Sequence, residues 1–335
     1  MLEIQGDYLE GGGAIMRLAL ALSILAKKPF AITNIRKGRK EPGLKEQHLQ
    51  TVRAAAKLCN ARIEGDELHS TQLSFSPRKI TNTNLEVNIS TAGSTALVLQ
   101  SLLIIGTKYN LNIHILGGGT FNLHAPSLIY MQKTLLPVLE RMNYKPSIEV
   151  VNNGFYPKGG AELKIKTRKT NLEPLELKER GKLNSVSCYS FASTHLKERK
   201  VAERQSETAR KLLEEYEINI CNKYVQSPCP GSGILLAAGF ENTFLGFDVP
   251  GEKQKTAEMV GEEAALGFKT QIDSGATVDE FMADQILPYL ALAKGKSQIK
   301  IPHLTRHAET NIWLIKQFLN VDFQVKDRII YVNPK

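Results

Sequence analysis

The segment EGGGAIMRLALALSILAKKPFAITNIR, residues 10–36, runs from a turn of small residues through an apolar helical stretch into a strand-like run. The same order recurs in residues 90–119, 125–151 and 277–301. In each segment apolar residues are spaced roughly as on one face of a helix, and a strand pattern follows. This recurrence, at imperfect intervals of roughly 50 residues, predicts stacked α+β units and not a solenoid.

Residues 182–276 interrupt this pattern with segments of a different character. In order they are a strand pattern (184–193), a highly charged helix (200–217), a loop rich in Pro and Gly (227–233), a hairpin pattern (233–249) and a second surface helix (252–272). Because the recurring order resumes after them, we predict an inserted, smaller α/β domain at 182–276. The large domain is then formed by residues 1–181 and 277–335.

Composition indicates a globular protein large enough for two domains, since the chain has 335 residues, 42% of them hydrophobic and 23% charged. An excess of 43 basic over 34 acidic residues gives a formal charge of +9, which suits a polyanionic partner such as nucleic acid or a nucleotide.

The four cysteines form no CxxC pair, which disfavours structural zinc and a disulfide framework. No apolar run approaches the roughly 18 residues of a membrane span, and no signal-peptide core is present, so we expect a cytoplasmic protein with no membrane partner.

HLTRHAETN, residues 303–311, places two histidines four residues apart, between a strand pattern (297–301) and a helix pattern from Asn311. An HExxH zinc site is disfavoured because Leu304 stands where the glutamate is needed. A P-loop ending in the GKS tripeptide is excluded because its first glycine would fall on Leu290. The chain also lacks GxGxxG and KxDG motifs, so the common nucleotide-binding signatures do not apply.

The turn EGGGAIMR, residues 10–17, is a candidate anion site. Three glycines that open a helix let backbone N–H groups approach a phosphate, and the helix dipole adds to the attraction. Glu10 beside them could bring a divalent metal ion to that phosphate. The residues alone favour a simpler interpretation, a tight strand-to-helix turn with Glu10 in solvent.

The stretch IRKGRKEPGLKEQH, residues 35–48, is a candidate phosphate clamp. Arg36 and Arg39 lie with two lysines in a loop punctuated by Gly and Pro, and an arginine can bind phosphate through two hydrogen bonds. Gln47 and His48 would enter the same site from the first turn of the following helix. A merely solvated basic loop explains the composition equally well.

Eight segments, taken together and in order, resemble those of RNA 3′-terminal phosphate cyclases. They are GDYLEGGGAIMR (6–17), IRKGRKEPGLKEQH (35–48), STAGSTALVLQ (90–100), GGGTFNLHAPS (117–127), GFYPKGGAE (154–162), GEKQKTAE (251–258), FMADQ (281–285) and HLTRHAETN (303–311). The resemblance covers nearly the whole chain. It implies a large domain of repeated βαβαββ-type units, related to the enolpyruvyl transferases, with a smaller inserted α/β domain.

The resemblance also implies an activity. Members of this family use ATP and a divalent metal ion, Mg²⁺ or Mn²⁺, to convert the 3′-terminal phosphate of an RNA into a 2′,3′-cyclic phosphate. A histidine attacks the α-phosphate of ATP, and AMP stays on the imidazole while pyrophosphate leaves. The AMP then passes to the RNA 3′-phosphate, and the neighbouring 2′-hydroxyl closes the ring and expels AMP.

By the same resemblance, His307 is the nucleophile, because it precedes the Thr-Asn pair of residues 310–311, and His303 has a supporting role. A neutral imidazole suits this chemistry, since it is nucleophilic at pH 7 and leaves readily once phosphorylated. Glu10 matches the metal-binding acid. The residues that match contacts to phosphates or to the RNA end are Arg17, Arg36, Arg39, Gln47 and His48.

The nucleotide pocket is the last part of the resemblance. Its matching residues are Gln100, Pro126, Phe281, Met282, Ala283, Asp284 and Gln285. Pro126 and Phe281 would lie on the two faces of adenine. Many family members have Tyr in place of Phe281, so stacking is kept and a hydroxyl contact is lost. Phe121 stands where the family usually has Asp.

Two other functions stay open at this point. The family has non-catalytic relatives that act as binding or assembly proteins in ribosome maturation, and its fold is shared with enolpyruvyl transferases. His307, Glu10 and the paired arginines argue against the first function, and the His307 motif has no role in the second. The sequence gives no prediction of the physiological RNA, the preferred metal, the oligomeric state or the role of residues 182–276.

Overall fold

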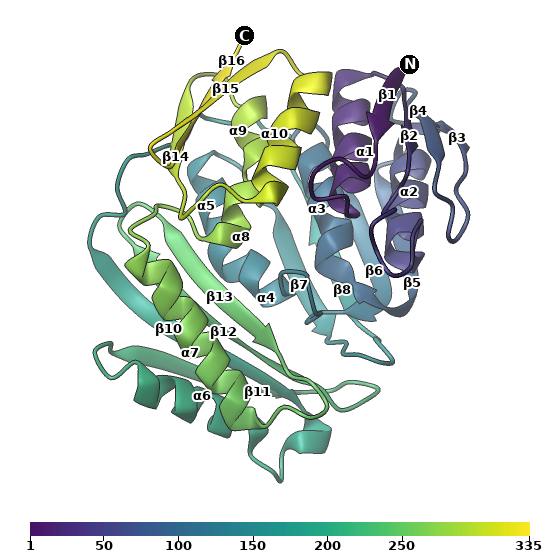
Figure 1. The fold of residues 1–335 in the computed structure, drawn as a ribbon. Helices are drawn as coiled ribbons and strands as arrows, with labels where there is room; N and C mark the ends of the chain where they lie inside the picture. Colours follow the sequence, from purple (N-terminus) through teal and green to yellow (C-terminus); the bar gives the residue numbers. More distant parts are fainter.

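The computed structural model describes residues 1–335 and shows a mixed α+β protein, which confirms the α+β class and leaves the repeated units a prediction (Figure 1). Its strands are β1 (Leu2–Gln5), β2 (Phe30–Thr33), β3 (Arg62–Glu64), β4 (Leu73–Ser76), β5 (Asn84–Ser94), β6 (Asn112–Gly119), β7 (Ser147–Asn152), β8 (Glu162–Lys166), β9 (Glu176–Leu177), β10 (Leu183–Ser193), β11 (Ile218–Val225), β12 (Ser232–Phe240), β13 (Phe244–Pro250), β14 (Ser297–Lys300), β15 (Val321–Lys326) and β16 (Ile329–Pro334). Its helices are α1 (Ala14–Ala26), α2 (Glu46–Cys59), α3 (Thr95–Gly106), α4 (Leu128–Tyr130), the π-helical turn η1 (Met131–Leu135), α5 (Leu136–Arg141), the 3₁₀ turn η2 (Thr194–Leu196), α6 (Val201–Leu212), α7 (Ala257–Asp273), α8 (Glu280–Gln285), α9 (Leu287–Leu292) and α10 (Arg306–Phe318). None of these helices combines the length and the apolar character that crossing a membrane requires.

Three of the four sheets share one strand order. They run β1-β2-β4-β3, β5-β6-β8-β7 and β9-β14-β16-β15, each with a parallel first pair and two antiparallel pairs after it. A parallel pair needs a crossover connection, which contains α1 in the first sheet, α3 in the second and α8–α9 in the third. Each of these sheets contains two helix–strand segments, so the sheet order recurs at a longer interval than the roughly 50 residues predicted for a single helix–strand segment.

The large core is built around α1 and α3, which are apolar on nearly every side. Ala19, Leu20 and Leu22 of α1 have no exposed surface, and α1 packs against α2, α3 and α10. Helices of this kind lie inside a protein and not on its surface. Each helix also carries one long polar side chain, Arg17 on α1 and Gln100 on α3, and Nη2 of Arg17 donates to Oε1 of Gln100 at 3.4 Å. Both side chains lie where the core borders the large cavity of the protein.

Residues 182–276, the small part, form the fourth sheet, in the order β11-β10-β12-β13. Helices α6 and α7 pack on one face of this sheet around a core of 14 buried residues, and β12 and β13 form the predicted hairpin. The other face lies against α4 of the remaining chain, the large part, where Tyr130 packs with Leu235 and Ala237. The small part thus has a sheet and a core of its own, and its status as an inserted domain stays a prediction.

Phe121 joins the two parts. Its ring stacks on that of Phe155 in the large part, with centroids 6.1 Å apart, and its centroid lies 5.9 Å from that of Phe191 in the small part. Cys229 of the small part completes this apolar cluster, in which Phe121 is 4% exposed. An aspartate at this position would be buried among apolar side chains, which is costly. The departure at Phe121 therefore supplies an apolar contact between the two parts.

Candidate active site

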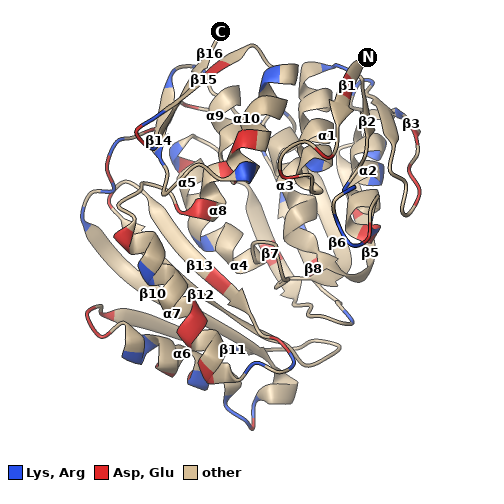
Figure 2. Ribbon diagram, in the orientation of Figure 1, with Lys and Arg blue, Asp and Glu red and all other residues tan.

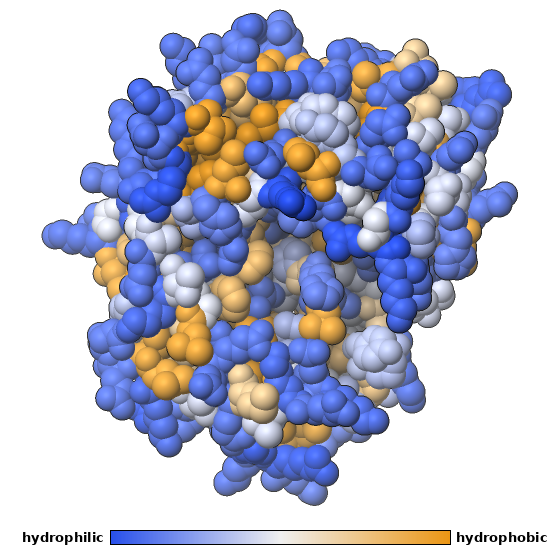
Figure 3. Space-filling model, viewed as in Figure 1, coloured by the Kyte–Doolittle hydropathy of each residue, from blue (hydrophilic) through white to orange (hydrophobic).

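A cavity of about 2180 Å³ lies between the large part and the small part, where Figure 3 shows the surface hollowed. The predicted site residues that line it are Glu10, Arg17, Arg36, Arg39, Gln47, His48, Gln100, Pro126, Phe281, Asp284, Gln285 and His307. Met282 and Ala283 are fully buried in the large core, so their side chains face away from the cavity. His303 is exposed and does not line it.

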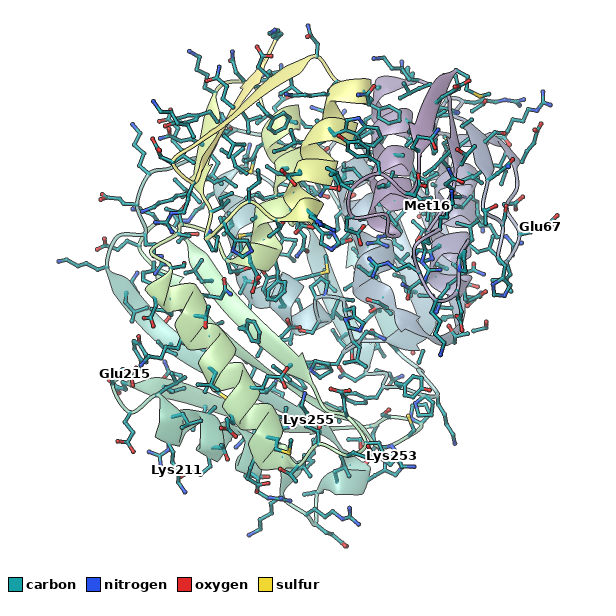
Figure 4. All side chains as sticks on the ribbon, in the orientation of Figure 1. Met16, Glu67, Lys211, Glu215, Lys253 and Lys255 are labelled. Atoms are coloured by element: carbon teal, nitrogen blue, oxygen red, sulfur yellow. The ribbon has the colours of Figure 1, made fainter.

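The small part supplies its own section of the wall, which the sequence did not predict. Asp248, Lys253 and Lys255 all line the cavity. Figure 4 shows Lys253 and Lys255 after β13 at the cavity end of the small part, whereas Lys211 and Glu215 lie at its far end. The site is therefore built by both parts of the chain.

Helix α10 carries His307 in its first turn. The Thr305 side chain caps the helix by accepting the N–H of Ala308 at 3.0 Å, so the helix begins before the predicted Asn311. The His307 side chain is 51% exposed. His307, Thr310 and Asn311 lie on one face of α10, because they are three and four residues apart.

The other two residues of that face tie α10 to its neighbours. Thr310 Oγ1 accepts the N–H of Glu10 at 3.3 Å, and Asn311 Nδ2 donates to the carbonyl of Asp284 at 3.0 Å. Their spacing therefore holds His307 between the glycine turn and α8. Sequence reasoning assigned no contact to Thr310 or Asn311, although the i, i+3, i+4 pattern was a usable signal.

The Glu10 carboxylate lies at the centre of the site. Its side chain is only 7% exposed, so the interpretation that placed it in solvent is wrong. Its Oε1 pairs with Nη2 of Arg39 and lies 3.6 Å from Nε2 of His307, and its Oε2 accepts the N–H of Gly12 at 2.6 Å. Gly11 has a φ of +62°, which glycine adopts without strain. A candidate nucleophile, an acid and a cation therefore meet at one end of the cavity.

His48 is held in one tautomer against the glycine turn. Its Nδ1 accepts the N–H of Lys45 at 3.1 Å, which leaves the proton of the neutral ring on Nε2. A Cβ on Gly13 would lie 2.2 Å from that Nε2, so only glycine fits there. Burial, reinforced by nearby cations such as Arg17, lowers the pKa of His48 well below its ordinary value. His48 is therefore a neutral hydrogen-bond donor at the turn.

Burial also sets the charges of other groups around the cavity. It lowers the pKa of His307, an effect that Glu10 partly opposes, so the imidazole is neutral at pH 7. It lowers the pKa of Arg17 to about 10, which still leaves the guanidinium protonated at pH 7. It raises the pKa of Asp284 to about 7, against the attraction of Arg17. The site thus combines a neutral imidazole with a buried cation.

The basic loop, residues 36–40, is coloured largely as Lys and Arg in Figure 2, and its two arginines have different contacts. Arg36 is 9% exposed, and its Nη1 donates to two loop carbonyls at 2.8 and 2.7 Å, so it braces the loop. Arg39 is half exposed and pairs with Glu10. Gln47 Oε1 accepts the N–H of the residue that caps α3, at 2.7 Å. The loop is therefore part of the site and is not merely solvated.

Comparison with known proteins decides the family. The family model for RNA 3′-terminal phosphate cyclase matches residues 8–325. The chain belongs to the RNA 3′-terminal phosphate cyclase family. The RNA 3′-terminal phosphate cyclase of Sulfurisphaera tokodaii is 42% identical to it over 330 residues, which cover 97% of this chain and 96% of that protein. Those of Methanococcoides burtonii and Korarchaeum cryptofilum are 38% and 37% identical, and the matches cover 98% and 97% of this chain and 97% and 94% of theirs. The predicted resemblance is confirmed.

For the metal ion implied by the resemblance to the cyclase family, the carboxylate nearest to His307 is that of Glu10, at 3.6 Å. No group of three or more His, Cys, Asp or Glu side chains is arranged to hold an ion. Mg²⁺ is usually bound by one or two carboxylates together with the phosphates of a substrate. The residues present therefore fit a metal shared between Glu10 and a triphosphate, and they do not fit a metal held by the protein alone.

In this member of the cyclase family, one end of the cavity is expected to hold the nucleotide. Aromatic side chains pack closely at that end. The Phe281 ring meets Tyr130 edge-on, with centroids 6.2 Å apart, and its centroid lies 5.5 Å from that of Phe247.

Three of the four buried side-chain polar atoms without a hydrogen-bond partner lie on the cavity wall, and they are Arg17 Nε, Gln285 Oε1 and Asn311 Oδ1. Since buried polar atoms are normally paired, these three side chains have unused hydrogen-bonding capacity at the cavity.

Proposed function

We propose that the protein converts the 3′-terminal phosphate of an RNA into a 2′,3′-cyclic phosphate with ATP, through a covalent adenylate on His307. The observation that carries the proposal is the meeting of a neutral, half-exposed His307 with Glu10 at a cavity that also holds unpaired buried polar atoms. Family membership supports the same activity.

Three steps account for the chemistry. His307 attacks the α-phosphorus of ATP, and a P–N bond forms as the bond to pyrophosphate breaks. The RNA 3′-phosphate then attacks that phosphorus, which releases His307 and gives an RNA-adenylate. The 2′-hydroxyl finally attacks the RNA 3′-phosphate, closes the five-membered ring and expels AMP.

The other residues take roles that their positions support. Arg17, Gln100, Asp284 and Gln285 would bind the nucleotide beyond its base, and Pro126 and Phe281 would hold adenine. The residues that would hold phosphates of the RNA end are Arg36, Arg39, Gln47 and His48. Glu10 would hold Mg²⁺ or Mn²⁺ together with the phosphates, and the chemistry such an ion would supply is neutralisation of charge on the departing pyrophosphate.

The fold supports the same assignment. We infer that the three sheets of common order are copies of the βαβαββ unit that the resemblance implies, related to the enolpyruvyl transferases. Their shared strand order and shared pairing sense support this inference. The small part would then be a domain inserted in the third copy, between β9 and α8.

The alternative is a non-catalytic cyclase-like protein that binds RNA during ribosome maturation. Incubation of a 3′-phosphorylated RNA with the protein, ATP and Mn²⁺ separates the two functions. We expect a phosphatase-resistant cyclic end, with one AMP and one pyrophosphate released per RNA. RNA binding without ATP consumption would support the alternative. Enolpyruvyl transfer is disfavoured because it gives His307 no role.

A further inference from the structure

Three consecutive residues of β13, in the small part, contact the two walls of the proposed adenine slot. The first is Gly246, whose N–H donates to Oδ2 of Asp279 at 3.0 Å. Asp279 Oδ1 in turn accepts the N–H groups of Phe281 and Met282 at 3.0 and 2.8 Å and so caps α8. Through this carboxylate, β13 fixes the start of the helix that carries Phe281.

Phe247 packs against the wall formed by Phe281. Its ring centroid lies 5.5 Å from that of Phe281, with an interplanar angle of 52°. On its other side the ring lies so close to α7 that a Cβ on Gly267 would come within 2.2 Å of it. Phe247 therefore fills the space between α7 and Phe281, and Phe281 cannot retreat in that direction.

Asp248 holds the opposite wall. Its Oδ2 accepts the N–H of Ser127 at 2.6 Å, and Ser127 directly follows Pro126. The Ser127 hydroxyl accepts the N–H of Tyr130 at 3.1 Å and caps α4. A carboxylate from the small part thus fixes the backbone of the loop that carries Pro126.

We propose that β13 sets the width of the adenine slot, so that the small part is a positioning element for the nucleotide. This inference rests on the proposed function, which places adenine between Pro126 and Phe281. Dispersion contacts fall steeply with distance, so a gap of a few tenths of an ångström on one face weakens stacking. One strand that holds both walls prevents such a gap, and Asp248 and Phe247 are then positioning residues that act through Ser127 and Phe281.

The test compares substitutions on one strand that point to opposite faces of its sheet. Asp248→Ala removes the bond to Ser127, whereas Asp248→Asn keeps an oxygen that can accept it. Val249→Ala is the matched control, because Val249 is 1% exposed in the core between the sheet and α6 and α7. Each variant is measured for ATP affinity, for the KM for ATP and kcat of self-adenylylation, for RNA affinity and for thermal unfolding.

We expect Asp248→Ala to raise the KM for ATP and the Kd of ATP about tenfold, with kcat and RNA affinity close to those of the wild type. Asp248→Asn should restore most of the ATP affinity. Val249→Ala should lower the unfolding temperature without changing the KM for ATP. Unchanged ATP affinity in Asp248→Ala, or an equal loss in Val249→Ala, would overturn the inference.

The proposed function and this inference fail in different ways. A wild-type protein that binds ATP and forms no AMP adduct would overturn the proposed chemistry, and the comparison of ATP affinities would still decide the role of β13. A wild-type protein that binds no ATP would overturn both.

Discussion

The carboxylates at the two ends of the cavity have different kinds of partner. At the phosphate end, Glu10 contacts both Arg39 and His307, which are each about half exposed. At the adenine end, Asp248 and Asp279 accept hydrogen bonds from backbone N–H groups of both parts of the chain. The half-exposed partners of Glu10 can move away into solvent, whereas the backbone N–H partners of Asp248 and Asp279 are fixed by the fold.

Under the proposed function, the base and the phosphates of ATP would therefore meet different kinds of surface. The base would enter a slot whose walls are already fixed by hydrogen bonds and packing. The phosphates would enter a group of side chains that must change partners, because a metal ion on Glu10 would compete with Arg39.

The largest effect is expected at His307. His307→Ala should abolish both AMP attachment and cyclisation, a loss on the order of 1,000-fold or more, because the proposed P–N bond forms on this imidazole. The fold should persist, since the side chain is half exposed. The measurements are incorporation of label from α-labelled ATP and the unfolding temperature.

His303→Ala is the matched control, because His303 is an exposed histidine of the same segment that lies off the cavity wall. It should retain detectable adenylylation. A covalent AMP adduct in His307→Ala would remove that residue as the nucleophile.

The second prediction concerns Glu10. Glu10→Ala should slow adenylylation on the order of 100-fold and weaken its dependence on Mn²⁺, because the metal loses its carboxylate. ATP affinity should change little, since the adenine slot is untouched. The measurements are ATP affinity and adenylylation rate across a Mn²⁺ titration.

Glu41→Ala serves as the control for Glu10, because Glu41 is an exposed acid whose only ion pair is with Lys45. It should behave as the wild type does. A Glu10→Ala protein with the wild-type rate and metal dependence would exclude Glu10 from the site.

A smaller effect is expected at the arginines of the basic loop. Arg39→Gln should reduce cyclisation about tenfold, and at least as much as self-adenylylation, because a charge-assisted contact to the RNA phosphate is lost. Arg36→Gln should do the same and also lower the unfolding temperature, because it loses the two loop carbonyls. Lys37→Gln, at an exposed cation of the same loop, is the control. Loss of adenylylation with intact transfer from preformed enzyme-AMP would move the arginines to the triphosphate.

The smallest effect is a dependence of stability on pH at the adenine end. Burial raises the pKa of Asp248 to about 6, well above the ordinary value of 3.8. The folded state therefore holds this proton more tightly than the unfolded state, and the stabilisation is present at low pH and lost as the pH rises through about 6.

This pH effect is measured against Asp248→Asn, which cannot titrate. From pH 5 to pH 8 the wild type should lose on the order of 1 kcal/mol of unfolding free energy relative to the variant. Stability curves that run parallel over this range would show that the Asp248 carboxylate is not held in a raised-pKa environment.

The phosphate end could largely be predicted from the sequence, because its residues lie in short local motifs. The glycine turn carries Glu10, and the first turn of α10 carries His307 with its partners three and four residues later. The burial of Glu10 could not be predicted, because it depends on Arg39 and α10, which are remote in the sequence.

The adenine end was only partly predictable. In α8, Phe281, Asp284 and Gln285 are three and four residues apart and line the cavity on one face of the helix. Met282 and Ala283 lie on the other face and are buried. The helical spacing could therefore have excluded these two residues from the predicted pocket. The contacts of Phe247 and Asp248 had no signal, because they link residues far apart in the chain and belong to no motif. The apolar contact that Phe121 makes between the two parts had one signal in the sequence, a Phe where the family usually has Asp.

The most direct test of the account is to locate the AMP on the protein. The wild-type protein is incubated with α-labelled ATP and Mn²⁺, digested, and the labelled peptide is sequenced by mass spectrometry. The account predicts a single AMP on the peptide that contains His307, joined through an acid-labile P–N bond. A label on His48, on a lysine or on any other residue, or a protein that consumes ATP without becoming labelled, would contradict it.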